Sequence, residues 1–330
     1  MGYYPTEIKQ GPLFFSALRK LISDFLLDAK RRRAGETAEM ASCAGLAGVA
    51  EIIDTCFDKS VAQGTLKIYQ RVRHEFLEFI KKFRVPASAL HKLRNVFLAH
   101  LIDKGKTRSL GYHVAALSHF FGPLPREDQD IQSALIRMAS RDTPPVKHRM
   151  KASQHDIDMV VAWALRLGTR EALTGAAAIL LMFSAFLRIG ELCNLRFSDV
   201  WFKGEDVWWL KIRRSKTDQK GLGSTVAFRL KEDALMLWMR FRELHSQNPQ
   251  EDHIFSNSRG GPPSRDYIAR RLKRTLTDAG LQHRNLTPHS FRGGAATTAI
   301  RAGADPSNVM RVGRWKSQKS FLSYVEPSPL

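Results

Sequence analysis

The sequence has little cysteine and no long apolar run. Its 330 residues include 3 cysteines, which are widely spaced and form no CxxC pair. An odd and scattered set of this kind indicates a reducing compartment and argues against a disulfide framework or a zinc site. The longest apolar run, residues 175–187, has about 13 residues, whereas a membrane-spanning helix needs ~20. We therefore expect no structural metal and no membrane span.

Acidic residues are also few relative to basic ones. The chain holds 52 Lys and Arg against 32 Asp and Glu, which gives a formal net charge of +20. This excess favours a polyanionic partner, because basic side chains displace the counterions condensed on phosphates. Charge alone leaves a ribosome or a membrane surface open as alternatives. Hydrophobic content of 43% and charged content of 25% are those of an ordinary globular protein.

A basic segment with two adjacent prolines divides the chain into two halves. Residues 141–151 read RDTPPVKHRMK, a composition that favours an extended, exposed strap over a helix. We place the linker at 141–152. An arm or helix at 1–45 and a helical domain at 46–140 precede it, and a second domain at 153–330 follows.

The first half is predicted to be entirely helical. Apolar residues recur at helical spacing over residues 63–83, and similar patterns predict helices from Pro86 to about 101, over 109–121 and over 128–140. Residues 1–45 are expected to form a further helix or a partly ordered arm.

The second half is predicted to be mixed. An apolar helix over 169–187 is interrupted at Arg188, after which a short helix resumes over 191–196. Two strands, 207–213 and 225–230, flank a polar hairpin. Further helices are expected at 231–246, 264–279, 288–302, 306–313 and 317–325. The fold class is therefore mainly α with a small antiparallel β-hairpin or sheet (α+β).

The strongest chemical signal begins at Thr287-Pro288. Threonine is a good N-cap and proline is favoured at the first helical position, so His289 and Arg292 fall on one face near a helix start. A helix N-terminus offers free N–H groups to a phosphate. Taken alone, these residues favour a capped surface helix with an incidental His and Arg. The Gly293-Gly294 pair that follows costs helix stability, which we expect close packing to offset.

Four further residues are candidates for the same site. Tyr324 is a candidate nucleophile, although a tyrosine near a chain end is usually a packing residue. Arg188 lies where the apolar helix breaks, and Glu191, three residues on, is placed to brace it. Lys216 lies at the tip of the predicted hairpin, where lysine is commonplace but is also able to reach into a groove.

The residues Arg188, Lys216, His289, Arg292, Trp315 and Tyr324 occur in an order that resembles the tyrosine recombinase (phage-integrase-like) family. The specific parts are residues 186–192, 289–292 and 313–315 and Tyr324. The match of residues 63–69 to the start of that family's helical, SAM-like core-binding domain is weaker. The sequence around Trp315, with only six residues after Tyr324, is also similar to recombinases of eukaryotic mobile elements of the DIRS type.

The resemblance implies a mechanism. Arg188 and Arg292 clamp the scissile phosphate, and Tyr324 attacks it to form a 3′-phosphotyrosine. His289 handles the tyrosine proton, and Lys216 protonates the leaving 5′-oxygen, although Lys211 and Lys220 lie close enough in sequence to be alternatives. Trp315 occupies a position that is often His in the family, and its indole N–H donates to the phosphate. No metal, ATP or other cofactor is required.

The resemblance also implies a C-shaped clamp around double-stranded DNA and a tetramer on two sites during the reaction. We predict DNA contacts from Lys147, Arg149 and Lys151 in the linker and from Lys67 and Arg71 in the first half. A type IB topoisomerase-like enzyme and an inactive, domesticated DNA-binding protein are the alternatives. The intact set of Arg188, His289, Arg292 and Tyr324 argues against the inactive protein.

The location expected for such a protein is intracellular and DNA-associated. That means the nucleus in a eukaryotic host and otherwise the cytoplasm or nucleoid. The N-terminus lacks the apolar run of a signal peptide. Residues 30–33, Lys-Arg-Arg-Arg, form either a nuclear import signal or, more simply, the basic end of a solvated helix.

Overall fold

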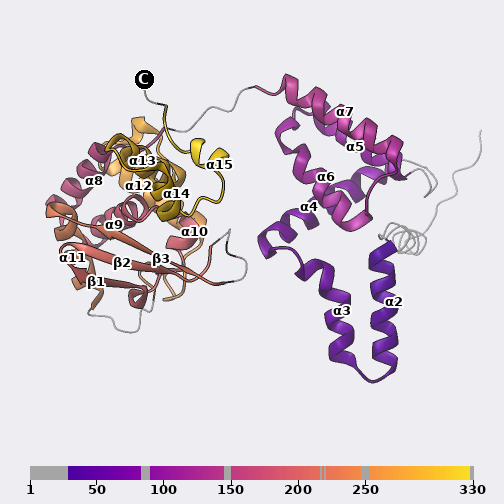
Figure 1. The fold of residues 1–330 in the computed structure, drawn as a ribbon, viewed down its shortest axis with the longest axis horizontal. Helices are drawn as coiled ribbons and strands as arrows, with labels where there is room; N and C mark the ends of the chain where they lie inside the picture. Colours follow the sequence, from indigo (N-terminus) through magenta and orange to yellow (C-terminus); the bar gives the residue numbers. More distant parts are fainter. Residues whose placement is uncertain are drawn as a thin grey trace, which may run out of the picture. The chain divides into compact units, whose positions relative to one another are not determined.

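The computed structural model describes residues 29–82, 90–144, 150–215, 218, 221–246 and 253–327. The chain forms two compact units, Met1–Val146 and Lys147–Leu330. In Figure 1 the first unit runs from indigo to magenta and the second from magenta to yellow.

The first unit is built from helices. Its core is formed by one face of α4 and by the helices that pack on it, with Val72, Phe76, Leu98 and Leu117 fully buried. These side chains recur at helical spacing in α4, as the sequence predicts. The helices are α2 (Ala29–Cys43), α3 (Ala47–Lys59), α4 (Gln63–Ile80), α5 (Leu90–Asp103), α6 (Leu110–Phe121) and α7 (Arg126–Asp142), with a short 3₁₀ turn at Thr107–Ser109.

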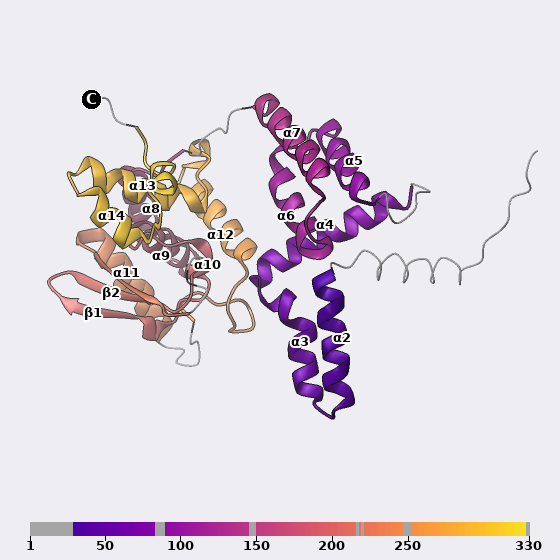
Figure 2. The ribbon, with the colours of Figure 1, turned by 45° about the vertical axis from the view of Figure 1, so that its right-hand side comes forward.

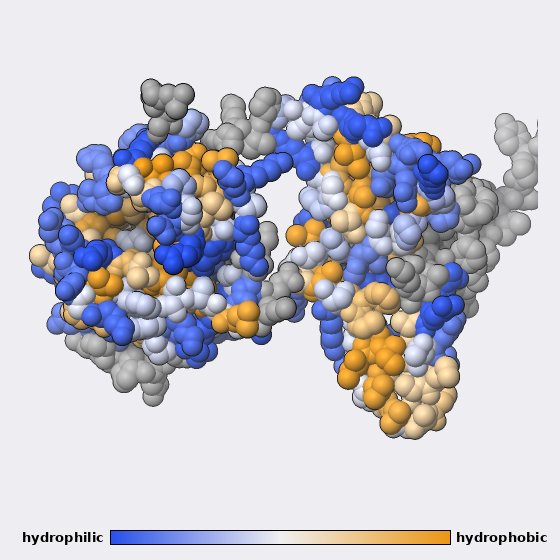
Figure 3. Space-filling model, viewed as in Figure 1, coloured by the Kyte–Doolittle hydropathy of each residue, from blue (hydrophilic) through white to orange (hydrophobic). Residues whose placement is uncertain are grey.

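Helices α2 and α3 form an antiparallel hairpin that exposes several apolar side chains, among them Met40, Leu46 and Ile52. Figure 3 shows an apolar patch at the lower end of this hairpin. Arg31 joins α2 to its neighbours through Asp58 on α3, at 2.8 Å, and the ring of His119 on α6. The expectation of a solvated basic helix end is therefore wrong for Arg31, which is largely buried, whereas Arg32 and Arg33 are exposed.

The second unit surrounds one apolar helix. Every residue of α9 from Ala172 to Phe183 is buried, and α8, α11, α12 and α13 all contact this helix (Figure 2). A helix that is apolar on all sides belongs at the centre of a domain. The helices are α8 (Gln154–Leu167), α9 (Arg170–Ser184), α10 (Ile189–Leu192), α11 (Glu232–Ser246), α12 (Arg265–Asp278), α13 (Pro288–Arg301), α14 (Pro306–Gly313) and α15 (Gln318–Leu322), with 3₁₀ turns at Phe197–Asp199 and Gln282–Arg284.

One small antiparallel sheet completes this unit. Its strands, β1 (Val200–Gly204), β2 (Val207–Ile212) and β3 (Ser224–Arg229), pair in the order β1-β2-β3. Alternate residues face the core, so that Trp208 and Phe228 are directly opposite one another and both buried. The fold class predicted from the sequence, mainly helical with a small antiparallel sheet, is confirmed.

Several features of the structure differ from the prediction, including helix α3, which is not among the predicted elements. Strand β1 is not among the predicted elements, because it has five residues and only Val200 is fully buried, which leaves little alternation in the sequence. Helix α8 is also missing from the prediction, although Ser153 and Asp156 form a capping box at its start. Helix α15 ends at Leu322, so Tyr324 lies in the turn beyond it and not inside the helix. In the part of the chain that the structure describes, no helix is long and apolar enough to cross a membrane.

Candidate active site

The break after α9 positions the first arginine. Phe186 has a φ of 52°, in the left-handed region that side-chain-bearing residues seldom adopt. This turn lets the chain reverse into α10, with Arg188 as its N-cap residue. It also aims the Phe186 carbonyl into the site, where it accepts hydrogen bonds from both Arg292 and Arg314. The sequence predicts a helix break in this region, but the break falls earlier than expected, between Ser184 and Ile189, and the short helix that follows spans Ile189–Leu192 instead of 191–196.

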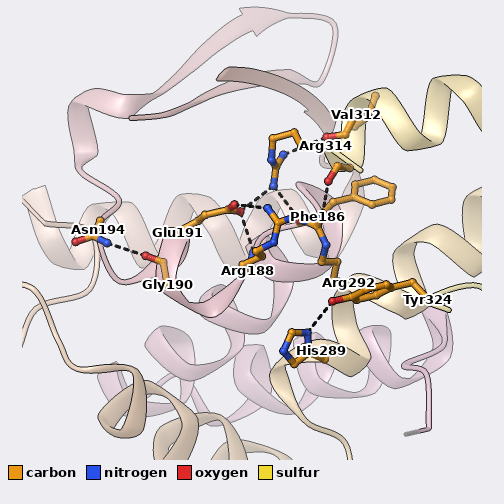
Figure 4. A network of polar contacts seen from close by, with 11 residues as sticks. Phe186, Arg188, Gly190, Glu191, Asn194, His289, Arg292, Val312, Arg314 and Tyr324 are labelled. Atoms are coloured by element: carbon orange, nitrogen blue, oxygen red, sulfur yellow. Dashed lines mark hydrogen bonds and ion pairs between the residues drawn. The ribbon is translucent and has the colours of Figure 1, made fainter. Parts of the chain in front are cut away.

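Glu191 is buried at the centre of this arrangement, with 5% of its surface exposed. Its carboxylate accepts from the Arg188 backbone N–H at 2.9 Å and from Arg188 Nη1 at 2.8 Å. Arg314 Nη2 donates to the same carboxylate at 2.8 Å. Glu191 therefore braces Arg188, as its spacing in the sequence suggests. Figure 4 shows both guanidinium groups converging on it.

The start of α13 is fixed by capping and by close backbone packing. The Thr287 N–H donates to Ser290 Oγ at 2.9 Å, and Pro288 occupies the first turn. A Cβ added to Gly294 would lie 1.9 Å from the carbonyl oxygen of Ala152. The Ala152 N–H donates to the Ser290 carbonyl at 3.1 Å. The glycine pair therefore allows the strap before α8 to lie directly against α13, in line with the close packing that the sequence predicts.

Arg292 points from α13 into the centre of the site and is 1% exposed. Its Nη1 and Nη2 donate to the carbonyls of Phe186 and Gly313. Its guanidinium carbon lies 4.2 Å from the ring centroid of Trp315, a cation–π contact. Burial, together with the charges of Arg188 and Arg314, lowers the pKa of Arg292 to about 9. The guanidinium is still charged at neutral pH, but its surroundings favour the arrival of an anion.

Tyr324 lies beside the arginines and is held by the packing of its neighbours. Phe321 and Trp315 belong to a small buried cluster against which the Tyr324 ring packs. The Glu326 N–H donates to Thr297 Oγ1 on α13 at 3.1 Å, which anchors the chain after the tyrosine. The Tyr324 ring centroid is 5.3 Å from that of Trp315.

The Tyr324 hydroxyl lies 3.1 Å from Nδ1 of His289, within hydrogen-bonding distance. When that nitrogen is unprotonated, it accepts the phenol proton. The buried Trp315 ring also packs edge-on against the ring of Phe186. The structure therefore brings together Arg188, His289, Arg292, Trp315 and Tyr324, five of the six residues predicted as catalytic.

The sixth, Lys216, lies outside the described residues, as do Lys147, Arg149 and Lys220. The alternative Lys211 is an exposed residue of β2 opposite Thr225. Lys67 and Arg71 are exposed one turn apart on α4, in the first unit.

The sequence does not predict the positions of two residues near the site, Lys151 and Arg314. Lys151, predicted as a DNA contact, has its Nζ 3.5 Å from the carbonyl of Ser323 and 5.7 Å from the Tyr324 ring centroid. Burial lowers the pKa of this lysine. Arg314 lies in the Gly313–Trp315 stretch of the sequence, in which only Trp315 is a predicted site residue. Its position just past the amphipathic α14 is the signal that it faces the core.

Several donors in the site are buried without an acceptor. Among the described residues, none accepts a hydrogen bond from Arg292 Nε, Arg314 Nε or Trp315 Nε1. A buried unpaired donor costs about 1–3 kcal/mol, and those of Arg292 and Trp315, whose side chains lie near the Tyr324 ring, are suited to an oxyanion. Over the same described residues, His, Cys, Asp and Glu side chains form no group of three that could hold a metal ion.

Comparison with known proteins defines the class to which this fold and site belong. The chain is 26% identical to an integrase/recombinase XerD homologue of Selenomonas ruminantium over 82% of its own length and 83% of that protein. It is 34% identical to a tyrosine recombinase of Agathobacter rectalis over 41% of the chain and 42% of the relative. The protein is a tyrosine site-specific recombinase.

Solved structures show the same fold. The integrase of transposon Tn1549 with transposon right-end DNA superposes with a TM-score of 0.56 at 15% identity, covering 82% of this chain and 91% of that one. The XerH recombinase in a post-cleavage complex gives 0.54 at 13% identity, covering 92% and 90%. Residues 156–329, more than half of the chain, match the phage integrase family. The chain belongs to that family.

Proposed function

We propose that this recombinase cleaves DNA through a covalent phosphotyrosine formed by Tyr324. The phenol oxygen attacks the scissile phosphorus, a P–O bond to tyrosine forms, and the bond to the 5′-oxygen breaks. The product is a 3′-phosphotyrosine and a free 5′-hydroxyl. A second 5′-hydroxyl reverses the step and rejoins the strand, so that the energy of the broken bond is retained without ATP.

The observation that carries this proposal is the 3.1 Å approach of the Tyr324 hydroxyl to His289 Nδ1, beside a buried arginine. His289 takes the phenol proton as the P–O bond forms. Arg188 and Arg292 then bind the non-bridging oxygens, because a guanidinium offers two parallel donors to a phosphate.

Two further groups complete the proposed reaction. The indole N–H of Trp315 donates to the same phosphate, which supplies the acceptor that the buried nitrogen lacks among the described residues. Lys216 gives its proton to the departing 5′-oxygen. Its assignment over Lys211 depends on the sequence resemblance and is tested by replacing each lysine separately.

The substrate we propose is double-stranded DNA bound by both units, with four protomers on two duplexes during strand exchange. The net charge of +20 supports a polyanionic partner. The XerH structure named above is bound to its palindromic difH substrate, and the Tn1549 structure is bound to transposon DNA. The tetramer follows from the family resemblance, and the kinship with DIRS-type elements stays a prediction.

Covalent trapping tests the proposal. Purified protein is mixed with a plasmid pool in EDTA without ATP and denatured with SDS, and DNA-linked protein is then collected. We expect an adduct with the wild type and none with Tyr324→Phe, which keeps the ring that packs against Trp315. An adduct that persists in Tyr324→Phe would show that another residue is the nucleophile.

Sequencing the trapped ends supplies the target site. An oligonucleotide carrying that site then measures binding and cleavage separately. Binding of the site without any adduct, in a protein that is folded, would favour the inactive DNA-binding alternative.

A further inference from the structure

Arg314 is buried beside the two arginines proposed to hold the phosphate. It is the C-cap of α14 and has a φ of 60°, in the left-handed region. Its side chain is 10% exposed. An uncommon backbone conformation and a charge removed from water both cost free energy. We expect a residue that has both of these costs, and that contacts the groups holding Arg188 and Arg292, to serve the reaction.

The contacts of Arg314 connect it to both other arginines. Its Nη2 donates to Glu191 Oε2 at 2.8 Å and to the Phe186 carbonyl at 2.9 Å. Glu191 is the carboxylate that holds Arg188, and the Phe186 carbonyl is the acceptor that Arg314 shares with Arg292 (Figure 4). Its Nη1 donates to the Val312 carbonyl at 3.1 Å, which fixes the guanidinium plane.

The cluster contains more positive than negative charges. Two guanidinium groups, those of Arg188 and Arg314, pair with the single carboxylate of Glu191, and the charge of Arg292 lies near enough to interact with all three. If Glu191 faced Arg188 alone, it would cancel much of the charge that Arg188 presents to a phosphate. A carboxylate shared by two arginines still orients Arg188 but leaves an excess of positive charge in a buried site. Buried charge acts more strongly on a reacting group than charge in water.

We propose that Arg314 is a positioning residue for strand cleavage. It holds Glu191 and the Phe186 carbonyl in place, and it adds a third positive charge that offsets the negative charge growing on the scissile phosphate. This inference rests on the proposed function and deepens it, because it assigns to the phosphate site a group that acts through Arg188 and Arg292.

The experiment compares two substrates that differ in charge. Each carries the target site; one has the normal scissile phosphodiester, and in the other a methyl group replaces one non-bridging oxygen to give a neutral methylphosphonate. Single-turnover adduct formation is measured at saturating protein for the wild type, Arg314→Met and Arg314→Lys. Methionine retains most of the side-chain volume without charge, and lysine retains the charge. Arg311→Met, an exposed arginine of α14 that donates to Asn308, is the matched control.

We expect Arg314→Met to bind the normal site as the wild type does but to form the adduct at least 100-fold more slowly. On the methylphosphonate, the rate of adduct formation by the same variant should be less than tenfold below that of the wild type. The reason is that the phosphorane formed from this substrate carries one negative charge fewer. Arg314→Lys should recover at least tenfold of the loss on the normal substrate, and Arg311→Met should match the wild type on both.

Equal losses on the two substrates would overturn the inference, because Arg314 would then be purely structural. Failure of both Arg314 variants to fold in thermal unfolding would lead to the same conclusion. If only Arg314→Met fails to fold, Arg314→Lys decides, by a larger loss on the phosphodiester than on the methylphosphonate. The absence of any adduct with the wild type would instead contradict the proposed function itself.

Discussion

Among the described residues, each unit of this protein buries one arginine almost completely, and the two arginines, Arg94 and Arg292, have different surroundings. Arg94 in the first unit is 2% exposed and donates to the Gly122 carbonyl at 2.9 Å and to Ser118 Oγ at 3.2 Å. Burial lowers its pKa to about 10, while the neighbouring Asp128 favours its charged form. Arg94 thus joins helix α5 to the end of α6.

Arg292 is buried to the same degree, and it donates to two backbone carbonyls. Its neighbours include Arg188 and Arg314, whose like charges oppose its own. Burial alone therefore does not distinguish a structural arginine from a functional one. The sign of the surrounding charges does distinguish the two arginines, because only an anion offsets the repulsion in a site that holds several positive charges.

The largest effect on the rate of adduct formation is expected for Arg292→Met. Removal of a preorganised donor from a transition-state site typically costs about 10²–10³-fold in rate. We expect adduct formation at saturating protein to fall by ~10³-fold, because two donors and a charge are lost. The DNA affinity, measured separately by a filter or mobility assay, should change far less. Comparable losses in affinity and rate would make Arg292 a positioning contact only.

The matched change Arg94→Met should act on stability. It leaves the Gly122 carbonyl without its buried donor, which costs about 1–3 kcal/mol. Denaturant unfolding of the intact protein should show that loss, with the rate of adduct formation per folded molecule unchanged. Arg292→Met should lose less stability, because the repulsion from Arg188 and Arg314 disappears with the charge. If Arg292→Met proved the more destabilising of the two, the contrast between the two arginines would be wrong.

The pH dependence separates the two arginines in a third way. Because the pKa of Arg292 is about 9, the charged fraction falls roughly tenfold for each pH unit well above that value. Adduct formation at subsaturating protein should therefore decline above pH 9, and this decline should be missing from the residual activity of Arg292→Met.

Stability should respond to the same pH change in the opposite direction. A buried arginine with a lowered pKa binds fewer protons when folded than when unfolded, at pH values between the two pKa values. The unfolding free energy contributed by Arg94 and Arg292 therefore rises with pH from about 9–10 toward 12. A loss of activity above pH 9 that coincides with unfolding by circular dichroism would contradict this assignment.

The smallest effect is expected from the exposed basic residues of α4. Lys67→Ala and Arg71→Ala should each weaken DNA binding a few-fold. Each should also reduce the slope of log affinity against log salt by about 0.9 for every phosphate that the side chain neutralises in the wild type. Replacement of the exposed Lys104, next to Asp103, serves as the control. An unchanged slope in both α4 variants would show that this helix face does not bind DNA.

The sequence predicts well those elements whose pattern is local. The spacing of Val72, Phe76 and Ile80 predicts α4, and the apolar run of α9 predicts a buried helix. Strand β1 is not predictable from its own residues, because its position depends on pairing with β2. Five residues with one fully buried position contain too little alternation to be recognised.

The candidate site likewise contains residues that the sequence identifies and one residue that it does not. Arg188, His289, Arg292 and Tyr324 are recognised by spacing and family resemblance, and the structure brings their side chains together. The role of Arg314 depends on a carboxylate 123 positions away. No local pattern reports such a contact, so only a three-dimensional structure could connect it to Glu191.

The close approach of Gly294 to Ala152 also affects how mutational data on this protein should be read. Any side chain at residue 294 would collide with backbone of the strap that enters the second unit. A saturation screen for activity would therefore score Gly294 as intolerant to substitution, much like Tyr324. In such a screen a residue required for folding and a residue required for DNA cleavage would both score as intolerant to substitution. Only soluble, correctly folded yield, measured beside activity, would tell them apart.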